Sequence, residues 1–156
     1  MRIAIASDHA AFALKAELAQ VLRDWGHDVL DLGPASADRV DYPDYGYKLA
    51  QVIADGTAER GVVLCGSGIG ISIAVNRHPA VRCALVNEPY AAALAREHND
   101  ANVIAMGARL IGPDMARTCL ETFLAAEFEG GRHTGRVEKL TNPQFPQTLS
   151  QSQDLA

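Results

Sequence analysis

The sequence predicts an α/β fold, a Rossmann-like three-layer α/β/α sandwich around a five-stranded parallel sheet. Short runs rich in Val, Ile, Leu and Ala alternate along the chain with longer segments that carry apolar residues at helical spacing. This β-then-α unit occurs five times in strict alternation. Because parallel strands must be joined by crossovers, such alternation places helices on both faces of one parallel sheet.

The five expected strands are short and apolar, as strands buried on both faces should be. They cover residues 2–7, 28–32, 62–65, 82–86 and 102–106. Helices are expected at residues 10–25, 44–54, 69–75, 90–97, 113–128 and 136–140. Gly26 ends the first helix, Asp44 is expected to cap the second, and Pro89 suits the first turn of the fourth.

The composition fits a single globular domain. The chain has 156 residues, is 48% hydrophobic and carries a net charge of −5. We expect one domain over residues 1–142 and a loose, Gln- and Ser-rich tail at 143–156. No Lys/Arg block suggests a nucleic-acid partner, and no apolar run is long enough for a membrane span. Since Met1 leads directly into a strand and the three cysteines are widely spaced, we expect a cytoplasmic protein with reduced thiols.

One thiol stands at the end of the third expected strand. The apolar run ends at Cys65, and Gly66, Gly68 and Gly70 follow before the next helix. Glycines let backbone N–H groups converge, so this turn can hold an anion beside a thiol. A free cysteine is often only a small core residue, and glycines also serve tight turns. However, three glycines in five positions exceed what a turn needs, and ligands of open α/β sheets bind where strands end.

Several other polar residues have a structural interpretation beside a functional one. Asp8 follows the first strand and can cap the next helix, or it can bind a ligand together with His9. His98 and Asn99 end a helix, where a histidine interacts well with the helix dipole and an asparagine takes a left-handed cap.

Two arginines near the end of the domain are candidates for binding phosphate. Arg132 and Arg136 lie four residues apart and would share one face of a helix. Two guanidinium groups match a phosphate dianion, although composition alone favours two solvated arginines. Arg109, after the fifth strand, is a third candidate for contacting phosphate or sugar. Tyr42 either lines the expected ligand pocket or only packs its own loop.

Seven motifs occur in an order and spacing that resemble one family. They are Ser-Asp-His-Ala at 7–10, Asp-Tyr-Pro at 41–43, Cys-Gly-Ser-Gly-Ile-Gly-Ile-Ser-Ile-Ala at 65–74, Asn-Glu-Pro-Tyr at 87–90, His-Asn-Asp-Ala-Asn-Val at 98–103, Gly-Ala-Arg at 107–109 and Glu-Gly-Gly-Arg-His at 129–133. Up to about residue 142, the chain resembles the sugar-phosphate isomerases of the ribose-5-phosphate isomerase type B family. The resemblance implies interconversion of ribose 5-phosphate and ribulose 5-phosphate, with no metal and no organic cofactor. The same family includes allose- and galactose-6-phosphate isomerases, so a hexose 6-phosphate is the alternative substrate.

The resemblance also implies how the residues after the third strand act. The reaction moves a proton between C1 and C2 through an enediolate, and Cys65 would be the base. Some family members lack this cysteine and use a Glu one turn into the following helix. Ile71 stands at that position here, so the cysteine arrangement is implied. The oxyanion would be stabilised by Ser67 and by the backbone of Gly66, Gly68, Ile69 and Gly70.

The remaining implied roles concern the sugar ring and the phosphate. His98 would be the acid–base group that opens the ring, Asp8 would bind sugar hydroxyls, and His9 would lie near the phosphate. The full set of further substrate contacts is Asp8, His9, Tyr42, Asn99, Arg109, Arg132 and Arg136. The family's pattern puts the site between the two subunits of an obligate homodimer, with a tetramer as the alternative assembly.

Two rival functions are weaker. A dinucleotide-binding enzyme would use Gly66-Ser-Gly68 and an acid such as Glu88, but its fingerprint needs a third glycine at position 71 and belongs after the first strand. A non-catalytic sugar-phosphate-binding protein would keep the glycines and arginines but would need neither Cys65 nor His98. The sequence also contains no HxH, CxxC or carboxylate–histidine pattern that predicts a metal site.

Overall fold

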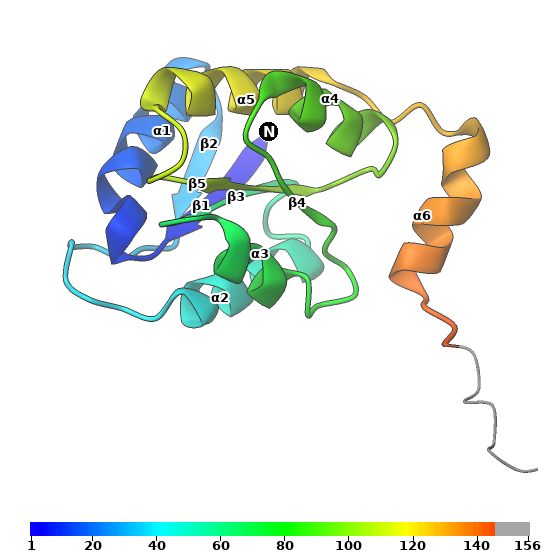
Figure 1. The fold of residues 1–156 in the computed structure, drawn as a ribbon, viewed down its shortest axis with the longest axis horizontal. Helices are drawn as coiled ribbons and strands as arrows, with labels where there is room; N and C mark the ends of the chain where they lie inside the picture. Colours follow the sequence, from blue (N-terminus) through cyan, green and yellow to red (C-terminus); the bar gives the residue numbers. More distant parts are fainter. Residues whose placement is uncertain (146–156) are drawn as a thin grey trace, which may run out of the picture.

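The sheet has five parallel strands in the order β2-β1-β3-β5-β4, which confirms the predicted fold class (Figure 1). The structure is a computed structural model that describes residues 1–145. Its strands are β1 (Arg2–Ser7), β2 (Asp28–Asp31), β3 (Arg60–Cys65), β4 (Cys83–Leu85) and β5 (Val103–Gly107). The predicted tail lies outside the described residues from position 146 onward.

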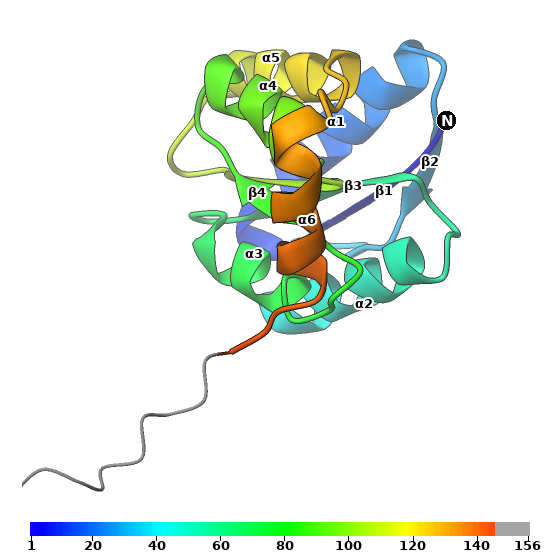
Figure 2. The same ribbon diagram turned by 90° about the vertical axis from the view of Figure 1, so that its right-hand side faces the viewer.

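Helices cover both faces of the sheet. They are α1 (Phe12–Asp24), α2 (Tyr42–Ala54), α3 (Ile69–Val75), α4 (Pro89–Glu97), α5 (Pro113–Ala125) and α6 (Thr134–Thr141), with 3₁₀ turns η1 (His9–Ala11) and η2 (Gly131–His133). Figures 1 and 2 show α1, α4 and α5 on one face and α2 and α3 on the other. Among the described residues, no helix is both long and apolar enough to cross a membrane.

The alternation of side chains along each strand divides the core in two. Ile3 and Ile5 of β1 pack with the α1, α4 and α5 layer, which contributes Phe123 and Leu120. Ala4 and Ala6 face the α2 and α3 layer. Successive strand residues point to opposite faces, so both faces of β1 are buried and its sequence is almost wholly apolar.

The strand order places a topological switch between β1 and β3. From β1 the chain crosses to β2 on one side, while β3 lies on the other side of β1. Ser7 pairs with Leu64 in the register of these two strands, and the N–H of Asp8 donates to the Leu64 carbonyl at 3.1 Å. The residues that follow β1 and β3 therefore start side by side at the carboxyl edge, where open α/β sheets bind ligands.

Two predicted helix boundaries are wrong for identifiable reasons. Helix α2 begins at Tyr42, so Asp44 lies in its first turn and not at its cap. The proline after Tyr42 suits the start of a helix because its missing N–H needs no partner there. Helix α5 ends at Ala125, since Ala126 is extended with ψ 145° and the chain then turns to α4, where the N–H of Glu129 donates to the Glu97 carbonyl at 3.0 Å.

Helix α6 stands beside the β4 edge of the sheet and leads away from the main body (Figures 1 and 2). It contains no buried residue. An eight-residue helix in water is marginal without tertiary packing. Within a single chain, α6 therefore buries no side chain that would stabilise it by packing.

Candidate active site

The turn between β3 and α3 presents Cys65 at the carboxyl edge of the sheet. Cys65 is the last residue of β3 and is only 4% exposed. The N–H of Gly68 donates to its Sγ at 3.1 Å. Gly68 has φ 76°, and a Cβ there would lie 2.8 Å from the carbonyl carbon of Met106, so only glycine fits. The turn thus aims a backbone N–H donor at the Cys65 sulfur.

A pocket of about 540 Å³ opens over this turn. It gathers predicted site residues from the ends of β1, β3 and β5 and from the start of α2. Its lining consists of Asp8, His9, Ala10, Tyr42, Cys65, Gly66, Ser67, Ile69, Gly70, Arg109 and Leu110. We call this the edge pocket. Gly68 donates its N–H to the Cys65 sulfur and is the one predicted turn residue that does not line this pocket.

Asp8 and His9 organise one wall of the edge pocket. Asp8 is 7% exposed, and its Oδ1 accepts the Ala10 N–H at 3.0 Å, so it does cap the first helical turn. The Nδ1 atom of His9 lies 3.1 Å from the carbonyl oxygen and 3.3 Å from the amide nitrogen of Val40. This contact fastens the loop before α2 to the pocket and leaves Nε2 as the remaining polar atom of the ring.

Tyr42 and Arg109 pack against the glycines of the turn and also line the edge pocket. A Cβ on Gly70 would lie 2.6 Å from the Tyr42 ring, so this glycine makes room for the tyrosine. The Arg109 side chain runs over Gly66, at 3.4 Å from the position of its missing Cβ. Arg109 forms no ion pair within residues 1–145, so its guanidinium is available to an anion in the edge pocket.

The predicted oxyanion site has fewer unpaired backbone donors than the glycine pattern suggests. The N–H of Gly68 is used by Cys65, and the N–H of Ile69 donates to the Ser67 Oγ at 3.3 Å. Two backbone donors of the turn are therefore engaged within it. The Ser67 hydroxyl keeps its own O–H to donate, because it accepts from Ile69.

His98 and Asn99 lie near the amino-terminal end of β5, whereas Cys65 lies at the carboxyl-terminal end of β3. His98 caps the carboxyl end of α4, and the chain then enters β5 at its amino end. Because β5 runs parallel to β3, the whole of β5 separates His98 from the level of Cys65. Four residue steps at about 3.3 Å make this roughly 13 Å. Neither His98 nor Asn99 lines the edge pocket of its own chain.

His98 belongs to a compact group of side chains that we call the α4-end cluster, formed by His98, Glu129, Arg132 and His133. The His98 and His133 rings are stacked, with centroids 4.3 Å apart and planes at 6°. A Glu129 oxygen lies 3.8 Å from His98 Nε2 and 3.7 Å from His133 Nε2. Arg132 Nε donates to His133 Nε2 at 3.2 Å.

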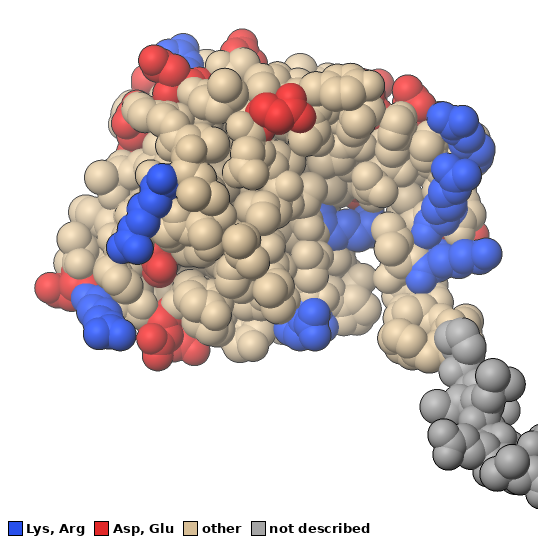
Figure 3. Space-filling model, in the orientation of Figure 1, with Lys and Arg blue, Asp and Glu red and all other residues tan. Residues whose placement is uncertain are grey.

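The two predicted phosphate arginines are not both on one α-helix. Arg132 lies in η2, and only Arg136 belongs to α6. The α-helix begins only after Arg132 because Gly130 and Gly131, with positive φ values of 65° and 55°, turn the chain just before it. Figure 3 shows Lys and Arg side chains gathered over α6, which carries Arg136 and Lys139. These arginines, like His98, lie outside the lining of the edge pocket.

Sequence reasoning overlooked Glu129 and His133 as individual residues. With His98 they form a carboxylate–histidine group whose candidate ligand atoms lie within 4.8 Å of one another. No spacing rule reveals it, because His98 comes from a different part of the chain. As a metal site it fits poorly. The stacked rings do not converge on one point, and the lone pair of His133 Nε2 is already used by Arg132.

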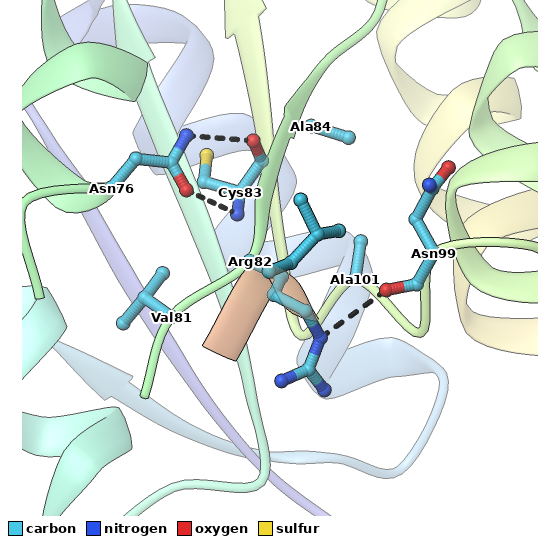
Figure 4. Close-up of a pocket in the computed structure, with 8 residues that line it drawn as sticks. Asn76, Val81, Arg82, Cys83, Ala84, Asn99 and Ala101 are labelled. Carbon is cyan, nitrogen blue, oxygen red and sulfur yellow. Dashed lines mark hydrogen bonds between the residues drawn. The ribbon is translucent and has the colours of Figure 1, made fainter. Parts of the chain in front are cut away.

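A second pocket, of about 430 Å³, lies between β4 and α6 (Figure 4). Asn76 pairs with the backbone of Cys83 in both directions, at 2.9 and 2.8 Å, and so covers the edge of β4. Arg82 donates to the Asn99 carbonyl at 3.2 Å. Asn99 faces this second pocket, and burial raises the pKa of the Cys83 thiol far above its usual range. A thiol held in that state makes a poor base.

Comparisons with known proteins identify the family to which this chain belongs. The family model described as Ribose/Galactose Isomerase matches residues 3–140. Ribose-5-phosphate isomerase B of Escherichia coli is 43% identical over 140 residues, which cover 90% of this chain and 94% of that protein. D-erythrulose-4-phosphate isomerase of Pectobacterium atrosepticum is 42% identical over 141 residues, or 90% and 93% of the two proteins.

Solved structures match equally well. Clostridium thermocellum ribose-5-phosphate isomerase B has a TM-score of 0.89 and 47% identity, covering 90% of this chain and 95% of that one. The Trypanosoma brucei type B ribose 5-phosphate isomerase has a TM-score of 0.87 and 43% identity, covering 90% and 96%. The family match at residues 3–140 spans the positions of the edge pocket, the α4-end cluster and most of α6.

Proposed function

Because the chain belongs to the ribose/galactose isomerase family and is a sugar-phosphate aldose–ketose isomerase, we propose that it interconverts ribose 5-phosphate and ribulose 5-phosphate. The observation that carries this proposal is the edge pocket, where a hydrogen-bonded Cys65 thiol lies in one lining with Asp8, Ser67 and Arg109, an arginine without an ion pair within residues 1–145. A hexose 6-phosphate is the competing substrate, and the tetrose phosphate named for one relative is another. Turnover measured over a panel of four-, five- and six-carbon aldose phosphates decides among them.

The edge pocket supplies the groups for proton transfer. Cys65 removes the proton from one of the two carbons and returns it to the other. The Ser67 hydroxyl and the free N–H groups of the turn stabilise the enediolate oxygen, and each donor of this kind is typically worth about 3 kcal/mol of barrier. Asp8 binds sugar hydroxyls, while Tyr42 lines the pocket. No step requires a metal ion or an organic cofactor.

The α4-end cluster supplies the other half of the chemistry. His98 opens the furanose ring of the aldose phosphate, and Asn99 contacts the sugar beside it. Arg132 and Arg136 grip the phosphate, where guanidinium groups form charge-assisted bonds that a lysine would make less specifically. His9 and Arg109 approach the phosphate or the sugar from the edge pocket.

These two halves lie at opposite edges of the sheet in one chain, so we propose a homodimer whose active sites are shared. Each site would combine the edge pocket of one subunit with the α4-end cluster and Arg136 of the other. Helix α6, with its exposed positive side chains, would pack on the partner subunit. The exposed apolar residues Ile69 and Ile73 of α3 and Leu85 of β4 provide contact surface for such a partner.

A cytoplasmic location completes the proposal, because Cys65, Cys83 and Cys119 are all free thiols. The decisive experiment is an assay of ribose 5-phosphate isomerisation with the wild-type protein and with Cys65→Ala after metal removal. We expect full activity in the first and none in the second. Activity retained by a folded Cys65→Ala variant would remove the thiol as the base.

A further inference from the structure

His133 occupies the centre of the α4-end cluster, although the mechanism above gives it no task. It is 5% exposed, one of the few buried polar side chains among residues 1–145. One face of its ring stacks on His98, and its Nε2 atom accepts the Nε–H of Arg132. A single buried ring thus contacts both the proposed ring-opening group and a proposed phosphate ligand.

The backbone is shaped to deliver this ring. The Glu129 N–H donates to the Glu97 carbonyl at the end of α4, and Gly130 and Gly131 then turn the chain with positive φ values. The N–H of His133 closes the turn by donating to the Gly130 carbonyl at 3.0 Å. Non-glycine residues adopt such φ values at a cost, so the Gly-Gly pair has a specific purpose here.

The hydrogen bond from Arg132 fixes the protonation state of His133. Nε2 can accept an N–H only if it carries the lone pair, so the ring is neutral and its proton is on Nδ1. Burial lowers the pKa of His133, and electrostatic interactions with the neighbouring His98, Arg132 and Arg136 lower it further. Glu129 is the one neighbouring charge that acts in the opposite direction. At neutral pH the ring is therefore an acceptor.

We propose that His133 is a positioning residue that orients the His98 ring by stacking and the Arg132 guanidinium by accepting its Nε–H bond. The inference rests on the proposed roles of His98 and Arg132. With Nε held by His133, the two Nη groups of Arg132 remain free to face the phosphate as a fork. The same ring keeps the His98 imidazole from rotating, so that ring opening and phosphate binding share one support.

Two substitutions separate the two contacts. His133→Phe keeps an aromatic ring for stacking on His98 but removes the acceptor for Arg132. His133→Gln keeps a carbonyl acceptor but removes the stacking ring. As a matched control, His27→Gln makes the same change in a partly exposed histidine that follows α1. His27 neither lines the edge pocket nor belongs to the α4-end cluster.

The two variants should fail in different ways. In His133→Phe, inhibition by inorganic phosphate should weaken about tenfold, because a hydrogen bond to a charged group is lost, and KM should rise while kcat changes little. In His133→Gln, phosphate inhibition should stay within about twofold of wild type while kcat for ribose 5-phosphate falls about tenfold, the size of a typical acid–base contribution partly lost. Solvent exchange of the C1 hydrogen of ribulose 5-phosphate, which needs no ring opening, should persist in His133→Gln.

Equal loss of kcat and phosphate inhibition in both folded variants would mean a purely structural role and would overturn the proposal. So would wild-type behaviour of both. Comparison with His98→Asn and Arg132→Ala keeps this test distinct from the proposed function. If those variants retain ring opening and phosphate inhibition, the roles of His98 and Arg132 fail instead. NMR of the imidazole nitrogens in the wild-type protein needs no variant: an Nδ1–H tautomer is expected for His133 at pH 7, and an Nε2–H tautomer contradicts it.

Discussion

A mixed dimer tests whether the active site is divided between two chains. One chain carries Cys65→Ala, which removes the proposed base from the edge pocket. The other carries His98→Asn, which removes the proposed ring opener from the α4-end cluster. Within one chain the length of β5, roughly 13 Å along the strand direction, separates the level of Cys65 from the end of the sheet at which α4 and His98 lie, whereas a catalytic acid or base must come within about 3 Å of its proton. Each parent homodimer lacks one of the two proposed groups in both of its sites, so it should be inactive toward ribose 5-phosphate.

The size of the rescue follows from the symmetry. In a mixed dimer, one site combines the intact edge pocket of the His98→Asn chain with the intact cluster of the Cys65→Ala chain. The other site lacks both groups. In a two-fold dimer, one of two sites is then complete, so the mixed dimer should have about half the wild-type activity. Random association of equal amounts of the two chains gives about one quarter, because only half of the dimers are mixed.

The assay uses two affinity tags and tandem purification of the co-expressed chains. Pairing Cys65→Ala with Asp8→Asn is the matched control, because both changes affect the edge pocket and no mixed dimer regains a complete site. That pair should stay inactive. If the Cys65→Ala and His98→Asn pair also stays inactive as a folded dimer, each site lies within one chain and the shared-site reasoning is refuted.

Four further outcomes are expected. Cys65→Ala should abolish solvent deuterium exchange at C1 of ribulose 5-phosphate by NMR, and His98→Asn should keep much of it; equal loss in both would end this division of labour. Arg132→Ala and Arg136→Ala should each weaken phosphate inhibition by about 2 kcal/mol, the scale of a charged hydrogen bond, and unchanged inhibition in both would place the clamp elsewhere. Exhaustive EDTA treatment should leave turnover intact, whereas loss restored by a divalent ion would favour a metal-assisted hydride shift. The pKa of His133 is lowered from its ordinary 6.5, so below about pH 6.5 the unfolded state binds more protons than the folded state. Thermal stability should therefore fall as the pH drops below about 6.5, and it should fall less steeply in His133→Gln.

The candidate site residues that the structure brings together are mostly those that follow strands. Asp8, Cys65 and Arg109 come after β1, β3 and β5, and parallel strands end at one edge of a sheet. Their convergence in the edge pocket therefore needs only the alternation of strands and helices. The order of the strands was not predicted, because it depends on pairing between segments that are distant in the chain.

The rest of the site depends on packing that local pattern does not encode. His98 ends a helix, and its neighbour His133 arrives from a turn that two glycines bend back toward α4. The motif Glu-Gly-Gly-Arg-His contained the necessary residues, but only the stacked rings show why the histidine is there. The start of α2 was missed for a local reason, since Tyr42 enters the helix ahead of the proline and Asp44 is not its cap.

Helix α6 connects folding to catalysis in this enzyme. Because α6 buries no residue, a free chain gives this short helix little stabilisation by packing. The helix nevertheless carries Arg136 and directly follows Arg132 and His133. If the partner subunit supplies the missing contacts, dimer formation both buries α6 and brings the phosphate ligands to the edge pocket. The proposed phosphate-binding groups would then be in place only where the partner subunit supplies the proposed base. A monomer would retain the thiol pocket without its ring opener, and so would leave cyclic ribose 5-phosphate unchanged.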